Sequence, residues 1–182
     1  MRLLLIFLLF LTNSYASNIK QEMLGLYQNN KFAKVCTMGF DNFAKYKRDE
    51  EFVSLYAFAC LNSDYIDRLA VPTAVLKFSK EARANSAYFS VILMQKKLLY
   101  HSLVDGYELS ELKLPTTDYV LSKVFDLYAK LGKHEKRAFY LFEDPKDKKL
   151  SYKLYLTKDY KIAKMVIEEY YDTMLLKRHI YW

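Results

Sequence analysis

The fold is decided by residues 24–70, which read LGLYQNNKFAKVCTMGFDNFAKYKRDEEFVSLYAFACLNSDYIDRLA. This stretch aligns with itself when it is shifted by 34 positions. The shift places Leu24 on Phe58, so an apolar side chain meets an apolar one. It also places the polar pair at 29–30 on the one at 63–64, so a turn meets a turn. A period near 34 is typical of helix–turn–helix repeats, in which each unit buries its apolar face against the next.

The spacing of apolar residues predicts helices over residues 18–27, 31–46 and 49–61. A fourth helix is expected to begin near Tyr65, and Pro72 is expected to interrupt it. The second helix has one apolar stripe, formed by Phe32, Val35, Cys36, Gly39, Phe40 and Phe43. Because Gly39 lies close to the position that matches Pro72 after the shift, both second helices are expected to bend at one level.

This stretch resembles tetratricopeptide-like repeats, in which paired helices stack into a curved array. The resemblance covers residues 24–70 and implies stacked helical hairpins. It further implies a surface that binds peptides or partner proteins, and it argues against catalysis.

The first sixteen residues have the pattern of a secretory signal. Arg2 precedes an apolar run over residues 3–11, and small residues follow at Ser14 and Ala16. The run is shorter than the ~20 residues that span a bilayer, so we expect cleavage after Ala16 rather than an anchor. The mature protein is then expected to be secreted or periplasmic.

An oxidising compartment changes how the two cysteines are interpreted, because disulfides persist there. Cys36 lies about as far before the predicted turn at 47–48 as Cys60 lies after it. In an antiparallel helix pair these positions are at one height, so a Cys36–Cys60 disulfide is sterically possible. Two buried free thiols that act as small hydrophobic groups are the alternative.

The second half of the chain changes from a helical to a strand pattern. Residues 86–104 are apolar on most sides, which predicts a central helix, and a further helix is expected to end at Gly132. From Ala138 onward, apolar and polar residues alternate around turn signals at 144–147 and 172–173. We predict an antiparallel meander of three or four strands; the alternative is a final helix over residues 159–177.

The resulting fold class is α+β, with stacked antiparallel helical hairpins followed by a small antiparallel β meander. The predicted division is a signal peptide at 1–16, a helical domain at 17–135 and the meander at 136–182. The meander is expected to pack on the helices, since a small sheet needs a cover for its apolar face.

The sequence contains no pattern that predicts catalysis, a metal site or a cofactor. The three histidines, His101, His134 and His179, lie far apart, and four dispersed glycines cannot form a phosphate loop. An enzymatic function would become a hypothesis again if the structure placed His101 or His179 in a cleft beside a carboxylate. The formal charge of +7 is consistent with a solvated basic surface or an acidic partner.

Two kinds of binding remain as functional hypotheses. The favoured one is a non-catalytic adaptor or assembly protein of the cell envelope, with the hairpins as its partner-binding surface. The alternative is a module that recognises cell-wall glycan through aromatic residues of the meander. Nucleic acid is not expected as a partner of an exported protein. The aromatic candidates for glycan or partner binding are Tyr152, Tyr155, Tyr170 and Trp182.

Overall fold

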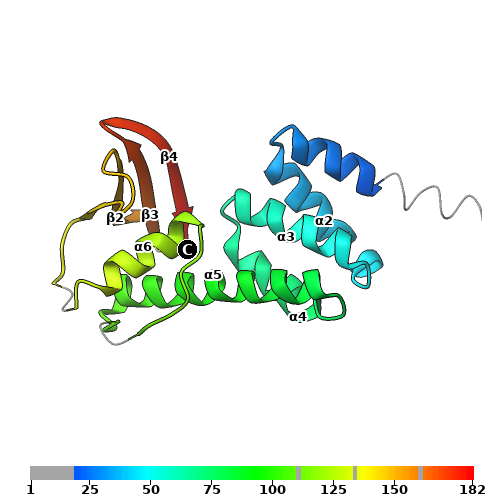
Figure 1. Cartoon of the computed structure of the whole chain (residues 1–182), viewed down its shortest axis with the longest axis horizontal. Coiled ribbons are helices and arrows are strands. Elements are labelled where there is room, and N and C mark those ends of the chain that lie inside the picture. Colours follow the sequence, from blue (N-terminus) through cyan, green and yellow to red (C-terminus); the bar gives the residue numbers. More distant parts are fainter. Residues whose placement is uncertain (1–18, 110–111, 133–134, 160–161) are drawn as a thin grey trace, which may run out of the picture. The chain divides into compact units, whose positions relative to one another are not determined.

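Helices come first along the chain and a four-stranded antiparallel sheet follows, which confirms the α+β prediction. The structure is a computed structural model, and it describes residues 19–109, 112–132, 135–159 and 162–182 (Figure 1). The predicted signal sequence therefore lies outside the described residues. Contacts divide the described chain into two compact units, which we call the helical unit (residues 19–85) and the sheet unit (residues 86–182). The division between the two units, after residue 85, falls within the range 17–135 that the sequence predicts as the helical domain.

The helical unit is built from hairpins. A helix over residues 19–28 is followed by α2 (Phe32–Tyr46) and α3 (Glu50–Asn62). The observed bounds of α2 and α3 match the prediction to within one residue. Asp49 caps α3, because its carboxylate accepts the N–H of Phe52 at 3.1 Å.

The turns that close the first and third helices are alike in detail. Asn30 and Asp64, which are 34 positions apart, both have positive φ, at 57° and 64°. After each of them, a backbone N–H reaches back to a carbonyl five residues earlier: Lys31 to Leu26, and Tyr65 to Cys60, both at 2.9 Å. This is the hydrogen bond of a Schellman helix end. The period seen in the sequence is therefore also a period of the backbone at these two turns.

The fourth helix is shorter than its counterpart α2. It begins as a 3-10 turn, η1 (Ile66–Leu69), and continues as α4 (Ala70–Val75). Pro72 does not interrupt the helix, because it lies in the first turn of α4, where its missing N–H is not needed. The tighter 3-10 winding just before it fits the proline ring, which in an α-helix would clash with the carbonyl four residues back.

Gly39 has a packing role between α2 and α3. It is buried in α2, and a Cβ added there would lie 2.4 Å from Cδ2 of the Tyr56 ring in α3. Real Cβ atoms do not approach so closely, so only glycine allows α2 and α3 this contact. Phe40, one residue on, is 56% exposed, and its predicted place in the buried stripe is wrong.

The loop between α4 and the next helix, α5 (Lys80–Asp105), is attached to α3 by one carboxylate. Glu50 accepts the backbone N–H groups of Lys77, Phe78 and Ser79 at 2.7–2.9 Å. These hydrogen bonds lower the pKa of Glu50 to about 2. The ionised carboxylate of Glu50 thus joins the start of α3 to the loop that follows α4.

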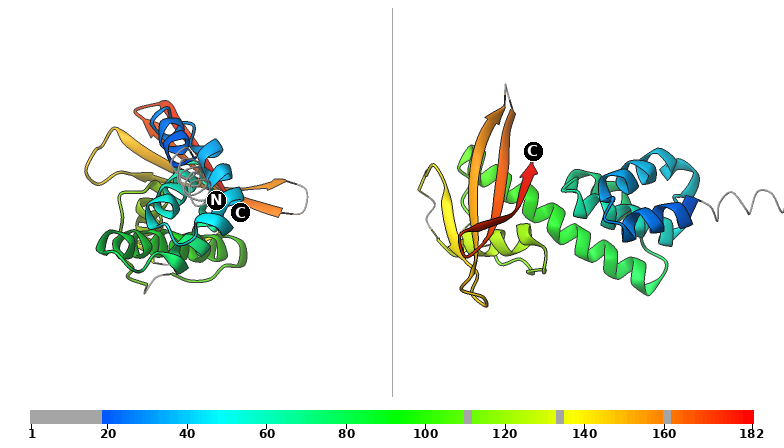
Figure 2. Two further views of the ribbon diagram at one scale, coloured as in Figure 1. Left: turned by 90° about the vertical axis from the view of Figure 1, so that its right-hand side faces the viewer. Right: turned by 90° about the horizontal axis from the view of Figure 1, so that it is seen from above.

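The sheet unit contains the later turns of α5, helix α6 (Val120–Ala129) and four strands. The strands are β1 (Tyr140–Glu143), β2 (Leu150–Asp159), β3 (Ile162–Tyr171) and β4 (Met174–Tyr181). They pair in chain order as an antiparallel meander, which Figure 2 shows as one twisted layer. The alternative of a final helix over 159–177 is wrong, because β3 and the start of β4 occupy that range.

Both predicted turns of the meander are present. Asp144 accepts the N–H groups of Lys146 and Asp147 and so forms the turn between β1 and β2. Asp172, with φ of 53°, lies in the two-residue turn between β3 and β4. Asparagine and aspartate tolerate this left-handed conformation better than other side chains do.

Strand register gives the sheet two different faces. The inner face contacts α5 and α6: Tyr140 packs edge-on against Tyr128 of α6, and Tyr100 of α5 donates to the carbonyl of Ala163 at 2.7 Å. It consists of Tyr140, Phe142, Tyr152, Leu154, Met165, Ile167, Glu169, His179 and Tyr181. The outer face points away from these helices and consists of Leu141, Lys153, Tyr155, Lys164, Val166, Glu168, Arg178, Ile180 and Trp182.

Candidate binding surfaces

The four aromatic candidates do not form one surface. Tyr152 is fully buried on the inner face, where its hydroxyl donates to Asp144 Oδ2 at 2.6 Å. No glycan or partner can reach this ring, which removes it from the candidate surface. Tyr155 is half-buried on the outer face, and Trp182 is 54% exposed there.

Tyr155 and Tyr170 are both held by Glu168. Their hydroxyl groups donate to its two carboxylate oxygens at 3.1 and 2.7 Å, and Arg178 adds an ion pair at 2.6 Å. Glu168 is only 3% exposed although it lies on the outer face. Burial alone would raise the pKa of Glu168, but the hydrogen bonds from Tyr170, Arg178 and Tyr155 outweigh it, and the pKa is lowered. The carboxylate therefore fixes its three neighbours at neutral pH.

Lysines of the outer face lie over aromatic rings. The ammonium of Lys153 is 5.0 Å from the ring centre of Phe139 and 5.4 Å from that of Tyr155. The ammonium of Lys164 is 5.4 Å from the ring centre of Trp182. All three distances are within cation–π range.

A hollow of about 720 Å³ lies between α6 and the turn from β1 to β2. Its lining mixes acidic and basic side chains: Asp118, Lys123, Asp126, Lys130, Asp144, Lys146 and Asp147. Asp144 is already engaged by Tyr152 and the turn backbone, which lower its pKa. Among the described residues, no group of three or more His, Cys, Asp or Glu side chains is placed to hold a metal ion.

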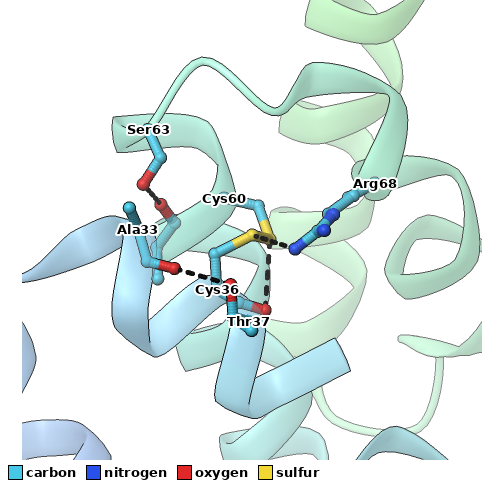
Figure 3. The surroundings of a disulfide bond; sticks show 7 residues. Ala33, Cys36, Thr37, Cys60, Ser63 and Arg68 are labelled. Atoms are coloured by element: carbon cyan, nitrogen blue, oxygen red, sulfur yellow. Dashed lines mark hydrogen bonds between the residues drawn. A yellow bond between two sulfur atoms is a disulfide. The ribbon is translucent and has the colours of Figure 1, made fainter. Parts of the chain in front are cut away.

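The helical unit contains the predicted disulfide between Cys36 of α2 and Cys60 of α3 (Figure 3). The two Cα atoms are 4.7 Å apart, within the range that a disulfide spans without moving the backbone. Both residues are fully buried, so the bond is part of the core between the two helices. The alternative of two free thiols is not what the structure has.

One side chain connects this disulfide to the surface. Arg68 of η1 points its Nη1 toward the sulfur of Cys36 at 3.4 Å (Figure 3). Its guanidinium also lies between two rings, 4.9 Å from the centre of Phe40 and 5.0 Å from that of Tyr65. The rings are 56% and 38% exposed. We call Phe40, Tyr65 and Arg68 the arginine cluster.

Two of the three histidines, His101 and His179, lie among the described residues, and each has a carboxylate beside it. His101 pairs with Asp105 one helical turn away on an exposed face of α5, and His134 lies outside the described residues. His179 does lie beside a carboxylate, with Nε2 2.7 Å from Glu169 Oε1, but it is 2% exposed on the inner face.

Sequence reasoning missed the residues that organise both surfaces. The spacing of apolar residues places Phe40 in the apolar stripe of its helix, and Arg68 belongs to no pattern in the sequence. Glu168 and Glu169 lie on opposite faces of β3, and the partners of Glu168 come from β2, β3 and β4. The sequence shows the charged and the aromatic residues but not that they lie side by side. Only the fold brings Arg68 to the rings of Phe40 and Tyr65.

Comparison of this chain with models of protein families, with curated proteins and with solved structures gave no match. No helix among the described residues is both long and apolar enough to cross a membrane. The surfaces of the two units are therefore the basis on which we infer a function.

Proposed function

We propose that this chain is an exported, non-catalytic protein of the cell envelope that binds a partner protein through its helical unit. The arginine cluster is the observation that carries this proposal. Arginine and tyrosine are the side chains most enriched at the energetic centres of protein interfaces. Here an arginine lies between two exposed aromatic rings, next to a buried covalent cross-link.

The cluster is also well suited to binding because it is already ordered. Side chains that lose rotamer freedom on binding reduce affinity, by ~0.5–1.5 kcal/mol each. Arg68 is constrained by two rings and a sulfur, and η1 follows directly after α3, which the disulfide joins to α2. A partner with a carboxylate or an apolar side chain at this point meets a surface that needs little rearrangement.

Site-specific photo-crosslinking in cells tests the proposal. A crosslinking residue at position 40 or 65 is expected to capture the same protein, and Arg68→Ala is expected to abolish that capture. Position 51 is the matched control, because Glu51 has a side chain that is 88% exposed on a neighbouring helix. Absence of a product at positions 40 and 65, or the same product at position 51, would contradict the proposal.

Export is tested separately by mass spectrometry of the mature chain. Cleavage after Ala16 and an intact Cys36–Cys60 disulfide are the expected results. A chain that keeps residues 1–16 and stays in the cytosol would contradict export without bearing on the arginine cluster.

A second candidate function is binding of cell-wall glycan by the sheet unit. The outer face supports it, because Tyr155 and Trp182 present ring surface on one side of the sheet. Aromatic rings stack on the apolar faces of sugars. Sedimentation of the mature protein with purified cell wall tests this function, and Tyr155→Ala with Trp182→Ala is the variant expected to stay in the supernatant.

A further inference from the structure

The loop between α4 and α5 carries Phe78, which at 72% is the most exposed large apolar residue that the structure describes. The ammonium of Lys77 lies 5.3 Å from the centre of its ring, and the residue is largely open to solvent all the same. Helix α4, directly before the loop, adds apolar surface, because it has no charged residue and its Val71 is 50% exposed. A single exposed apolar side chain needs no explanation by itself. The loop that presents Phe78 is what makes it informative.

Every main-chain polar group of residues 77–79 has a partner inside the helical unit. The three N–H groups donate to the carboxylate of Glu50 at 2.7–2.9 Å. Two of the three carbonyls accept from Nη1 of Arg83, at 3.3 and 2.6 Å, and the third accepts from the backbone N–H of the same residue at 3.1 Å. The backbone around Phe78 therefore does not need water as a hydrogen-bond partner.

A backbone with complete hydrogen bonding matters most where water is excluded. An unpaired N–H or carbonyl group is costly in an apolar medium, so irregular backbone enters such a medium only when its polar groups are satisfied by the protein. The loop at Phe78 meets this condition. Two media of this kind are an apolar pocket of another protein and the interfacial region of a bilayer, and the charges near Phe78 distinguish them.

Basic side chains flank Phe78 along the chain. Residues 77–83, which read KFSKEAR, contain three basic residues and one acidic residue. Lys77 and Lys80 are exposed, and within the described part of the chain neither ammonium group has an ion-pair partner. Lysine is depleted from protein interfaces, whereas at a membrane surface its apolar stem lies along the lipid and its ammonium reaches the phosphates. The surroundings of Phe78 therefore favour an anionic lipid surface over a protein pocket.

We propose that Phe78 inserts into the interfacial region of an anionic phospholipid bilayer, with the ammonium groups of Lys77 and Lys80 at lipid phosphates. Glu50 and Arg83 are positioning residues, because they hold the loop in the form that presents the ring. The contact lies on the membrane surface and needs no spanning segment. It is independent of both proposed functions.

The test measures co-sedimentation of the mature full-length protein with vesicles of phosphatidylglycerol and phosphatidylcholine. Vesicles of phosphatidylcholine alone are the second arm. We expect the affinity for the neutral vesicles to be lower by about tenfold or more, because each lysine near an anionic surface contributes about fivefold. Binding to the anionic vesicles is expected to weaken as salt is added.

Two variants separate the ring from the charge. Phe78→Ala is expected to weaken binding to both kinds of vesicle about tenfold, because it removes the apolar surface that enters the lipid. Lys77→Gln with Lys80→Gln is expected to weaken binding to anionic vesicles about tenfold and to leave the weaker binding to neutral vesicles unchanged.

Matched controls come from the same unit. Leu24→Ala removes an apolar side chain from a residue that is 48% exposed on another helix. Lys31→Gln with Lys34→Gln removes two exposed lysines at the start of α2. Because neither control touches the loop, each is expected to change the affinity less than about twofold.

Fluorescence shows whether the ring itself enters the lipid. Trp182 is the single tryptophan, so Phe78→Trp is made together with Trp182→Phe. Emission from position 78 is expected to shift to shorter wavelength when anionic vesicles are added, and to be quenched by brominated lipid. Leu24→Trp in the same background is expected to show neither change.

Glu50→Gln tests the positioning role of the carboxylate. The change removes a negative charge, which by itself would strengthen binding to anionic vesicles, and it also removes the acceptor that orders the loop. We expect binding to weaken about two- to fivefold, because a loop that is not ordered in advance loses affinity on binding. Stronger binding would contradict the positioning role.

Absence of binding to anionic vesicles overturns the inference, and so does a Phe78→Ala variant that binds them as well as the native protein. Binding without any change of emission at position 78 overturns insertion of the ring. Capture of a protein by a crosslinking residue at position 78, in a chain that does not bind vesicles, assigns the loop to a protein interface instead. Crosslinking at positions 40 and 65 is a separate readout, so the partner-protein function can fail while membrane insertion stands, and the reverse.

Discussion

The two units hold their surfaces in place by different means. In the helical unit, a disulfide joins α2 to α3, and the exposed arginine cluster lies directly beside it. The sheet unit has no cysteine, and ionised carboxylates take that role: Asp144 holds Tyr152, and Glu168 holds Tyr155, Tyr170 and Arg178. A small unit with a limited core can thus be stabilised covalently or by buried charge with complete hydrogen bonding. The disulfide is sensitive to reductant, whereas the buried carboxylates are sensitive to acid.

Loss of the disulfide is the change that separates the units most strongly. It closes a loop over a sequence separation of 24, which is worth about 3–4 kcal/mol in the chain-entropy model. Reductant, or Cys36→Ala with Cys60→Ala, is expected to destabilise the helical unit and leave the sheet unit unchanged. Hydrogen exchange resolved by peptide checks this. Equal loss of protection in β2 and β3 would show that the units do not respond independently, and reductant should do nothing to the double variant.

Replacement of Gly39 tests the packing between α2 and α3 without touching the disulfide. In Gly39→Ala the new methyl group would lie 2.4–2.6 Å from atoms of Tyr56, so we expect the free energy of unfolding to fall by about 2–3 kcal/mol. Gly25→Ala is the matched control, because no atom lies within 4 Å of its added Cβ and the position is helical. It should gain about 0.5–1 kcal/mol. Chemical denaturation measures both, and similar effects of the two changes would refute this account of Gly39.

In the sheet unit the corresponding test is Tyr152→Phe. It removes the donor that holds Asp144, whose side chain is 8% exposed, and is expected to cost about 1–2 kcal/mol. The hydrogen bond from Tyr152 lowers the pKa of Asp144, so its contribution is present above the ordinary aspartate value and is lost as pH falls below it. The variant should therefore lose less stability on acidification than the native protein does. A steeper loss would contradict the role of this pair, and Tyr155→Phe on the half-buried outer face is the milder control.

Acid is also expected to destabilise the helical unit, at the loop that Glu50 holds. The pKa of Glu50 is about 2 in the folded chain, so its stabilising hydrogen bonds are complete above the ordinary glutamate value and are lost as pH falls toward 2. Glu50→Gln should remove that dependence and expose the amides of Lys77, Phe78 and Ser79 to exchange at neutral pH. Glu51→Gln, on the same helix turn, should leave them protected. If Glu50→Gln leaves their exchange unchanged, the carboxylate does not hold the loop.

Much of the architecture could be read from local patterns. The bounds of α2 and α3, the helix stop near Asp64, the meander and both of its turns depend on residues that are neighbours in sequence, which is why periodicity and turn chemistry found them. Cys36 and Cys60 could be paired because the predicted hairpin set their heights. The resemblance to tetratricopeptide-like repeats stays a prediction, although the two turns at Asn30 and Asp64 share one geometry.

The predictions of which side chains are buried failed where burial depends on contacts between residues that are distant in sequence. Phe40 and Val35 look alike in the sequence, yet one is 56% exposed and the other fully buried. Tyr152 and Tyr155 are three residues apart in one strand, and only the position of α5 and α6 decides which of them is inside. Glu168 is one of two adjacent acidic residues in the sequence, and only the paired strands bring Tyr155, Tyr170 and Arg178 to its carboxylate.

By itself, the sequence predicted the order of helices and strands and the places of the turns, because these depend on short-range periodicity and backbone preference. It also showed that a Cys36–Cys60 disulfide was sterically possible, but left two free thiols as the alternative. Tertiary structure alone decided which face of each element is covered, and hence where Arg68, Lys153 and Glu168 acquire neighbours. The physical reason is that burial and charge pairing are properties of side chains packed together in space, and residues far apart along the chain supply them.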